Sequence, residues 1–227
     1  MSYVFPPAPT PSVPVVGTEA QFPVHRIYCV GRNYAEHARE MGHDPDREPP
    51  FFFQKNPDNI VLDGHFPFPP LSTDVQFEVE LVVALRSGGT NISAASVDDL
   101  VFGYGIGLDM TRRDLQGAAK KLGRPWETGK AFEASAPMSP LWATAVVGHP
   151  RSGAISLDVN GVRRQSGDLS QMIWDVPHLI ANLSSLFELR AGDLVMTGTP
   201  AGVGAVARGD RMLGRVEGLG ELAVEVV

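Results

Sequence analysis

Cysteine is nearly absent from this chain of 227 residues, which contains a single one, Cys29. One thiol excludes an intramolecular disulfide, and its position in an apolar run predicts a small buried side chain. The sequence also lacks a charged-then-apolar leader and any apolar run of about 18 residues. We therefore expect neither export nor membrane spanning, and a cytoplasmic location.

Positive charge is also scarce: 19 Lys and Arg against 26 Asp and Glu give a net charge of −7, which argues against a nucleic-acid partner. No P-loop, dinucleotide-binding, G-x-S-x-G or zinc-type Cys/His motif is present. An anionic small-molecule substrate would then need local cations or a metal ion.

Turn-forming residues are abundant, with 24 Gly and 19 Pro, and 43% of the residues are hydrophobic. We predict a Pro-rich extended arm over residues 1–23 and a single catalytic domain over 24–227. Strands outnumber helices and few are joined by crossover helices, which disfavours a doubly wound parallel sheet. Strands are expected over 24–30, 51–55, 74–84, 101–108, 155–159, 162–165 and 194–197, and helices over 34–41, 112–122 and 177–187.

The helix over 112–122 is expected to begin after Thr111 as its N-cap, with Asp114 in the first turn. The residues expected on its apolar face are Leu115, Ala118, Ala119 and Leu122. Arg113, Gln116 and Lys120 would share the opposite face by their i+3 and i+4 spacing.

The segment DVQFEVELVVA, residues 74–84, is the central feature of the sequence. With a period of two, Glu78 and Glu80 point to the same side of the strand, with about 7 Å between their α-carbons. Neither has a Lys or Arg nearby in sequence, so the two carboxylates would repel unless a cation lies between them. The alternative is a solvated E-x-E face on an edge strand.

Asp109, at the end of the apolar stretch GYGIGLD, could supply a third oxygen ligand. Carboxylates are the ligands that hard divalent cations such as Mg²⁺ or Mn²⁺ prefer. We hypothesise one such ion held by Glu78, Glu80 and Asp109.

Two further groups suggest catalysis, and each has a simpler interpretation. His37 and Glu40 share a helix face, as a general base and its orienting acid or as an ordinary surface pair. Lys130, within TGKAF, either lies along a strand with its charge in water or points into a pocket. The turn TGTPAGVG, with Thr199, could bind an oxyanion through its N–H groups, or be an ordinary tight turn.

Several motifs occur in one order: VGRNYAEHAREMG, FEVEL, LDMTRRDLQ, KKLGRPWETGKAF, VNG…RQ and GDLVMTGTPAGVG. Together they resemble the fumarylacetoacetate hydrolase family over about residues 25–226. The resemblance implies a β-rich α+β fold, a mixed β-sandwich or roll with a few short helices, and a homodimer. It also implies Mg²⁺ or Mn²⁺ at Glu78, Glu80 and Asp109, a catalytic His37–Glu40 pair, and substrate contacts at Arg113, Gln116, Lys130 and Thr199.

The reaction this resemblance implies is hydrolysis of a carbon–carbon bond in a 2,4-diketo acid. Fumarylpyruvate, cleaved to fumarate and pyruvate in gentisate-type aromatic catabolism, is the expected substrate. The alternatives are another acylpyruvate, oxaloacetate decarboxylation, isomerisation of a diene-dioate, or metabolite binding without catalysis. No nucleic-acid or membrane partner is expected.

Overall fold

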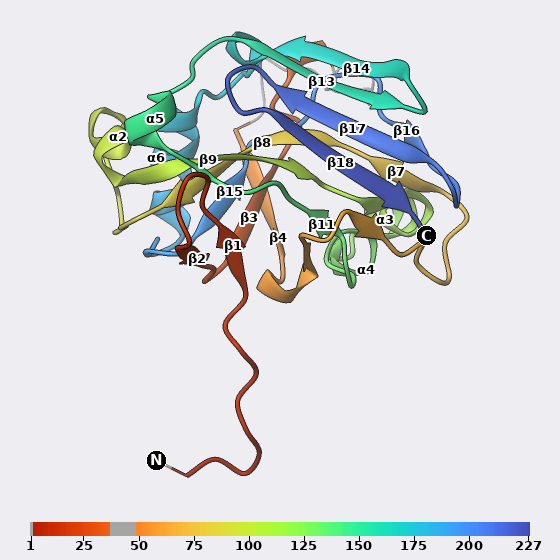
Figure 1. Cartoon of the computed structure of the whole chain (residues 1–227), viewed down its shortest axis with the longest axis horizontal. Helices are drawn as coiled ribbons and strands as arrows, with labels where there is room; N and C mark the ends of the chain where they lie inside the picture. Colours follow the sequence, from red (N-terminus) through yellow and green to blue (C-terminus); the bar gives the residue numbers. More distant parts are fainter. Residues whose placement is uncertain (1, 37–48) are drawn as a thin grey trace.

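Two β-sheets packed face to face form the body of the protein in the computed structural model, which describes residues 2–36 and 49–227 (Figure 1). The larger sheet has six strands in the order β12-β9-β8-β15-β3-β4, and the other has five in the order β14-β13-β17-β18-β6. Short helices lie at the two ends of the sandwich. In the described part of the chain, every helix is too short or too polar to cross a membrane.

The elements confirm the predicted β-rich α+β class. The strands are β1 (Ser12–Pro14), β2 (Gln21–Pro23), β3 (Ile27–Gly31), β4 (Phe51–Lys55), β5 (Ile60–Val61), β6 (His65–Phe66), β7 (Val75–Phe77), β8 (Val79–Leu85), β9 (Val101–Leu108), β10 (Thr111–Arg112), β11 (Ala136–Pro137), β12 (Trp142–Ala143), β13 (Ala154–Val159), β14 (Val162–Asp168), β15 (Leu194–Met196), β16 (Gly204–Ala205), β17 (Arg211–Val216) and β18 (Glu221–Val226). The helices are η1 (Pro57–Asn59), η2 (Ala94–Ser96), α2 (Val97–Leu100), α3 (Arg113–Lys121), α4 (Glu127–Lys130), α5 (Thr144–Val147), η3 (Leu169–Gln171) and α6 (Val176–Leu186).

The main core lies between the two sheets, and the alternation along β7 and β8 decides which side chains enter it. Phe77, Val79, Leu81 and Val83 are all buried in this core, as a period of two requires. The sheets approach closely at Gly214 of β17, where an added Cβ would lie 3.2 Å from a Val79 methyl carbon. Burial of these apolar side chains between the sheets therefore fixes the positions of Glu78 and Glu80, which point to the other side of the strand.

The hairpin between β13 and β14 confirms the strongest local prediction. Asn160 and Gly161 have φ values of 51° and 78°, the left-handed conformation that a two-residue hairpin turn requires at both positions. The hairpin brings Gln165 of β14 over the E-x-E strand, where its side-chain oxygen accepts a hydrogen bond from the Val79 N–H at 3.0 Å.

Residues 12–23 of the predicted N-terminal arm, 1–23, pack against the body of the protein. Strands β1 and β2 pair antiparallel, and Val13 and Phe22 are buried in a second core cluster that includes Ile27 of β3. In the described part of the chain, the segment before β1 extends away from the body of the protein (Figure 1). These strands can form because proline is tolerated in strands at a sheet edge, and their apolar residues gain from burial against the body of the protein.

Helix α3 corrects two local predictions. Arg112, not Thr111, occupies the N-cap position, and Thr111 belongs to β10. The predicted apolar face is only partly right: Ala119 is buried, but Leu122 is 61% exposed whereas Gln116 is only 4% exposed. The helix turns its polar face inward because that face borders a polar pocket, in which Gln116 is hydrogen-bonded to Arg113.

Candidate metal centre

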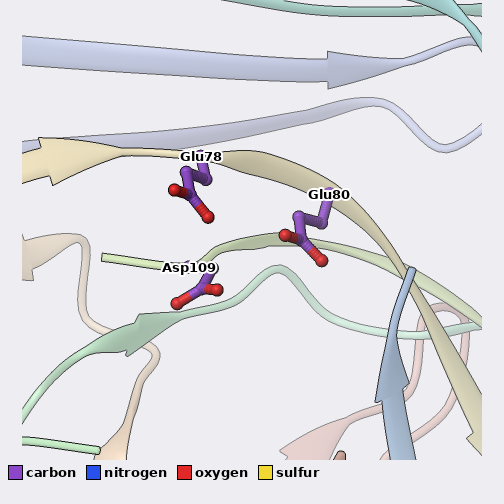
Figure 2. A group of neighbouring side chains, drawn as sticks. All are labelled: Glu78, Glu80 and Asp109. Atoms are coloured by element: carbon purple, nitrogen blue, oxygen red, sulfur yellow. The ribbon is translucent and has the colours of Figure 1, made fainter. Parts of the chain in front are cut away.

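Three carboxylates converge in the interior of the protein. Glu78, Glu80 and Asp109 are 6%, 1% and 0% exposed, and one oxygen from each lies within 4.8 Å of the others. Figure 2 shows the three side chains directed into one space between their strands. The predicted convergence of these residues is therefore present in the structure.

Strand pairing explains the convergence. Glu80 is on β8, and Glu78 occupies the break between β7 and β8. Asp109 follows the last residue of β9, and its N–H donates to the Glu78 carbonyl oxygen at 2.8 Å. Strand β8 lies between β9 and β15 in the six-stranded sheet, so the alternative of a solvated face on an edge strand is excluded.

Lys130 directs its charge into this centre. Its Nζ donates to Glu78 Oε2 at 2.8 Å, to Asp109 Oδ2 at 2.7 Å and to Thr111 Oγ1 at 2.7 Å. Burial opposes the charge, but Asp109 and Glu78 raise the pKa of the Lys130 ammonium above its ordinary value. The alternative in which this lysine extends to solvent is excluded. Arg113 forms a further ion pair, with Glu78 Oε1.

Lys55 is a third cation at the centre, and the sequence analysis missed it. Its Nζ lies 2.9 Å from Asp109 Oδ1 and donates to the backbone oxygens of Met110 and Lys130. Asp109 Oδ1 nevertheless accepts no well-aligned hydrogen bond. The available signal was a lysine at the end of the short strand FFFQK, which begins with three phenylalanines. Only the pairing of β4 with β3 brings that strand end to the carboxylates.

Glu80 differs from the other two carboxylates in its partners. Among the ion pairs of the described residues none includes it, and its Oε2 accepts one hydrogen bond, from the Gly198 N–H at 2.7 Å. Burial, and next the charges of Asp109 and Glu78, raise the pKa of Glu80 well above its usual range. The three carboxylates therefore fit a small divalent cation, because oxygen donors suit Mg²⁺ or Mn²⁺ and the ion would supply the charge that Glu80 lacks.

The turn after β15, in the segment TGTPAGVG, closes the centre on another side. Its Gly198 N–H is directed at Glu80, and the Thr199 hydroxyl donates to the Val79 carbonyl oxygen at 2.7 Å. Gln165 donates to the same hydroxyl at 2.8 Å, so the hairpin of β13 and β14 holds this turn in place. The turn is therefore more than an ordinary tight turn. Its Gly198 N–H binds a protein carboxylate, so the predicted oxyanion contact does not apply to that group.

A pocket opens from the carboxylates and is bordered by α3, α4 and β4. The predicted residues that line it are Glu78, Glu80, Arg113, Gln116, Lys130 and Thr199. Gln116 Oε1 accepts from Arg113 Nη1 at 2.7 Å. This arrangement orients the Gln116 side chain and leaves its amide nitrogen as a donor for a ligand. His37 and Glu40 lie outside the described residues.

The fold and the site define a β-rich α+β protein with a carboxylate centre at the base of a pocket. Residues 26–227 match the family described as fumarylacetoacetate (FAA) hydrolase C-terminal. The chain therefore belongs to the fumarylacetoacetate hydrolase family.

Relatives of two kinds are similar over nearly their whole lengths. A fumarylpyruvate hydrolase from Ralstonia sp. is 43% identical over 192 residues, which cover 82% of this chain and 98% of the relative. An oxaloacetate tautomerase from Escherichia coli K12 is 41% identical over 199 residues, covering 86% and 90%. The crystal structure of fumarylpyruvate hydrolase from Pseudomonas aeruginosa, in complex with Mn²⁺ and pyruvate, has a TM-score of 0.98 at 52% identity and covers 100% of this chain and 99% of that one.

Proposed function

We propose that the protein is a metal-dependent hydrolase that cleaves the carbon–carbon bond of a 2,4-diketo acid, with fumarylpyruvate as substrate. The observation that carries the proposal is the group of three buried carboxylates, of which Glu80 forms no ion pair with any described residue. Glu78, Glu80 and Asp109 would hold Mg²⁺ or Mn²⁺. The similar Pseudomonas aeruginosa enzyme, whose structure contains Mn²⁺ and pyruvate, supports the choice of metal and of product.

When bound, the divalent ion polarises the carbonyl group of the 2-oxo acid and offsets the negative charge that develops there. His37, oriented by Glu40, takes a proton from water, and the hydroxide adds to the carbonyl carbon C4. The C3–C4 bond then breaks, which releases the acyl group as a carboxylic acid and leaves its electron pair on C3. His37 returns its proton to C3, and the second product is pyruvate.

Lys130 stabilises the enolate charge that forms as the C3–C4 bond breaks. All three of its N–H bonds are donated to protein oxygens, so its contribution is a positive charge held close to the reacting atoms. A buried ammonium is effective in this role because the surrounding protein screens charge poorly.

Arg113 and Gln116 bind the carboxylate of the 2-oxo acid end. Both line the pocket beside Glu78, and their mutual hydrogen bond holds the two side chains in one orientation. Thr199 also lines the pocket, and its hydroxyl is hydrogen-bonded to Val79 and Gln165, so we assign it to shaping the site around the substrate. We also propose that residues 24–227 act as one catalytic domain, that the protein is a homodimer, and that the reaction belongs to aromatic catabolism.

Turnover in H₂¹⁸O tests this function. With Mn²⁺ and fumarylpyruvate, we expect loss of the enol absorbance, one ¹⁸O atom in the fumarate carboxylate, and an equal amount of pyruvate, because the attacking water becomes part of the released acid. Fumarate without ¹⁸O, or no consumption of the diketo acid, would contradict the proposal.

A second candidate is a reaction of oxaloacetate, which the 41% identical tautomerase and a 40% identical oxaloacetate decarboxylase from Dictyostelium discoideum favour. Both reactions would use the same carboxylates and an enolate but no attacking water. Release of CO₂ from oxaloacetate, or its keto–enol exchange, at rates above those for fumarylpyruvate would select this alternative. A protein that only binds metabolites would turn over neither compound.

A further inference from the structure

Two cations in the pocket have no role in the proposed cleavage. Lys120, on the polar face of α3, and Arg32, just after β3, line the same pocket as the carboxylates. Lys120 is half-buried, and its ammonium forms no hydrogen bond or ion pair with any described residue. An unpaired ammonium on a pocket wall is a candidate contact for an anionic group of a ligand.

An aromatic wall holds these two cations in place. The Arg32 guanidinium lies 5.2 Å from the ring centroid of Phe51, and the Lys120 Nζ lies 6.0 Å from that of Trp126. Phe51 and Trp126 pack edge to face with their centroids 5.3 Å apart. The cations thus flank one aromatic pair, where cation–π attraction limits their freedom.

The same wall continues to the carboxylate centre. Trp126 packs against Phe53 with centroids 5.8 Å apart, and the Lys130 Nζ lies 5.0 Å from the Phe53 ring. A ligand anchored at the carboxylates and extending past Phe53 and Trp126 would reach Lys120. Flat unsaturated chains suit such a surface, because aromatic faces pack best against planar groups.

The electrostatics of the pocket agree with this path. Burial, followed by the charges of Arg32 and Arg113, lowers the pKa of the Lys120 ammonium below its ordinary value. Cations that face one pocket repel each other, and an anion placed among them removes that cost. Negative charge in the described part of the pocket is confined to Glu78 and Glu80, at the carboxylate centre.

We propose that Lys120, assisted by Arg32, binds a second carboxylate at the end of the substrate far from the metal-binding residues. The inference rests on the proposed function and defines its substrate class: acylpyruvates with a planar acyl chain that ends in a carboxylate. Lys120 and Arg32 are then specificity-determining residues, and Phe53 and Trp126 form the surface along which the acyl chain lies.

A pair of substrates that differ only at this end tests the proposal. Crotonylpyruvate has a methyl group where fumarylpyruvate has its terminal carboxylate. In Lys120→Met we expect kcat/KM for fumarylpyruvate to fall about 10- to 100-fold, mainly through KM, because a charge-assisted contact made equally in the ground and transition states is lost. With crotonylpyruvate the variant should stay within about twofold of the native enzyme, which also shows that it folds.

Neighbouring variants serve as controls. Lys121→Met removes an exposed charge from the same helix and should leave both substrates unaffected, and Lys120→Arg should keep the preference for fumarylpyruvate. Equal losses on both substrates, or none on either, would overturn the subsite. A binding titration of the Mn²⁺-loaded protein with fumarate and with crotonate tests the carboxylate subsite separately from the proposed cleavage reaction. A preference for fumarate that disappears in Lys120→Met supports the subsite even if no diketo acid is cleaved, and absence of that preference rejects it.

Discussion

Replacing Glu80 with glutamine is expected to abolish both metal binding and catalysis. The substitution keeps the shape of the side chain but removes one of three carboxylates whose oxygens lie within 4.8 Å of one another. It also removes the group that no cation in the described structure neutralises. We expect kcat with fumarylpyruvate to fall on the order of 10³-fold or more, since the ion supplies several kcal/mol of charge stabilisation.

Calorimetric titration with Mn²⁺, thermal melting and steady-state kinetics measure these effects. Without metal, the variant should melt no lower than the native protein, because the buried repulsion among the carboxylates is reduced. With Mn²⁺, only the native protein should gain stability. Glu19→Gln, at an exposed turn between β1 and β2, is the matched control and should behave as native. Full Mn²⁺ affinity in Glu80→Gln would show that this carboxylate is not a ligand.

Replacing His37 with alanine is expected to separate catalysis from metal binding. In the proposed reaction His37 takes the proton from water, a contribution of about 10²- to 10⁴-fold in rate. We therefore expect kcat to fall by that factor, while the Mn²⁺ affinity stays within about twofold of the native value. The loss of activity at acidic pH should also disappear from the residual activity, because the base whose protonation causes it is gone.

The comparison requires kinetics at several pH values and a metal titration on the same preparation. His65→Ala removes an exposed imidazole on β6 and should change neither the rate nor the metal affinity. Near-native turnover in His37→Ala would remove the general-base role, and a parallel loss of Mn²⁺ affinity would indicate a role in the metal site instead.

The acidic centre was predictable because it depends on local rules. Strand periodicity places Glu78 and Glu80 on one side, and the lack of a neighbouring cation in sequence indicates a site that needs one. The turn at Asn160 and Gly161 was predictable for the same reason, since few residues tolerate its backbone conformation.

Features that depend on contacts between distant segments could not be predicted. Lys55 reaches Asp109 only through the order of strands in the six-stranded sheet, which no local pattern encodes. Thr111 resembles a helix N-cap but pairs with Gln76 of β7, so tertiary structure overrides the capping preference. Gln116 is polar yet buried because its partner Arg113 is held by Glu78.

Anomalous diffraction from crystals soaked in Mn²⁺ is the most direct test of the central assignment. We expect a single strong peak bounded by carboxylate oxygens of Glu78, Glu80 and Asp109, at distances of about 2.0–2.3 Å typical of hard cations and oxygen ligands. A crystal saturated with Mn²⁺ that shows no peak there, with Lys130 still bridging Glu78 and Asp109, would contradict the account.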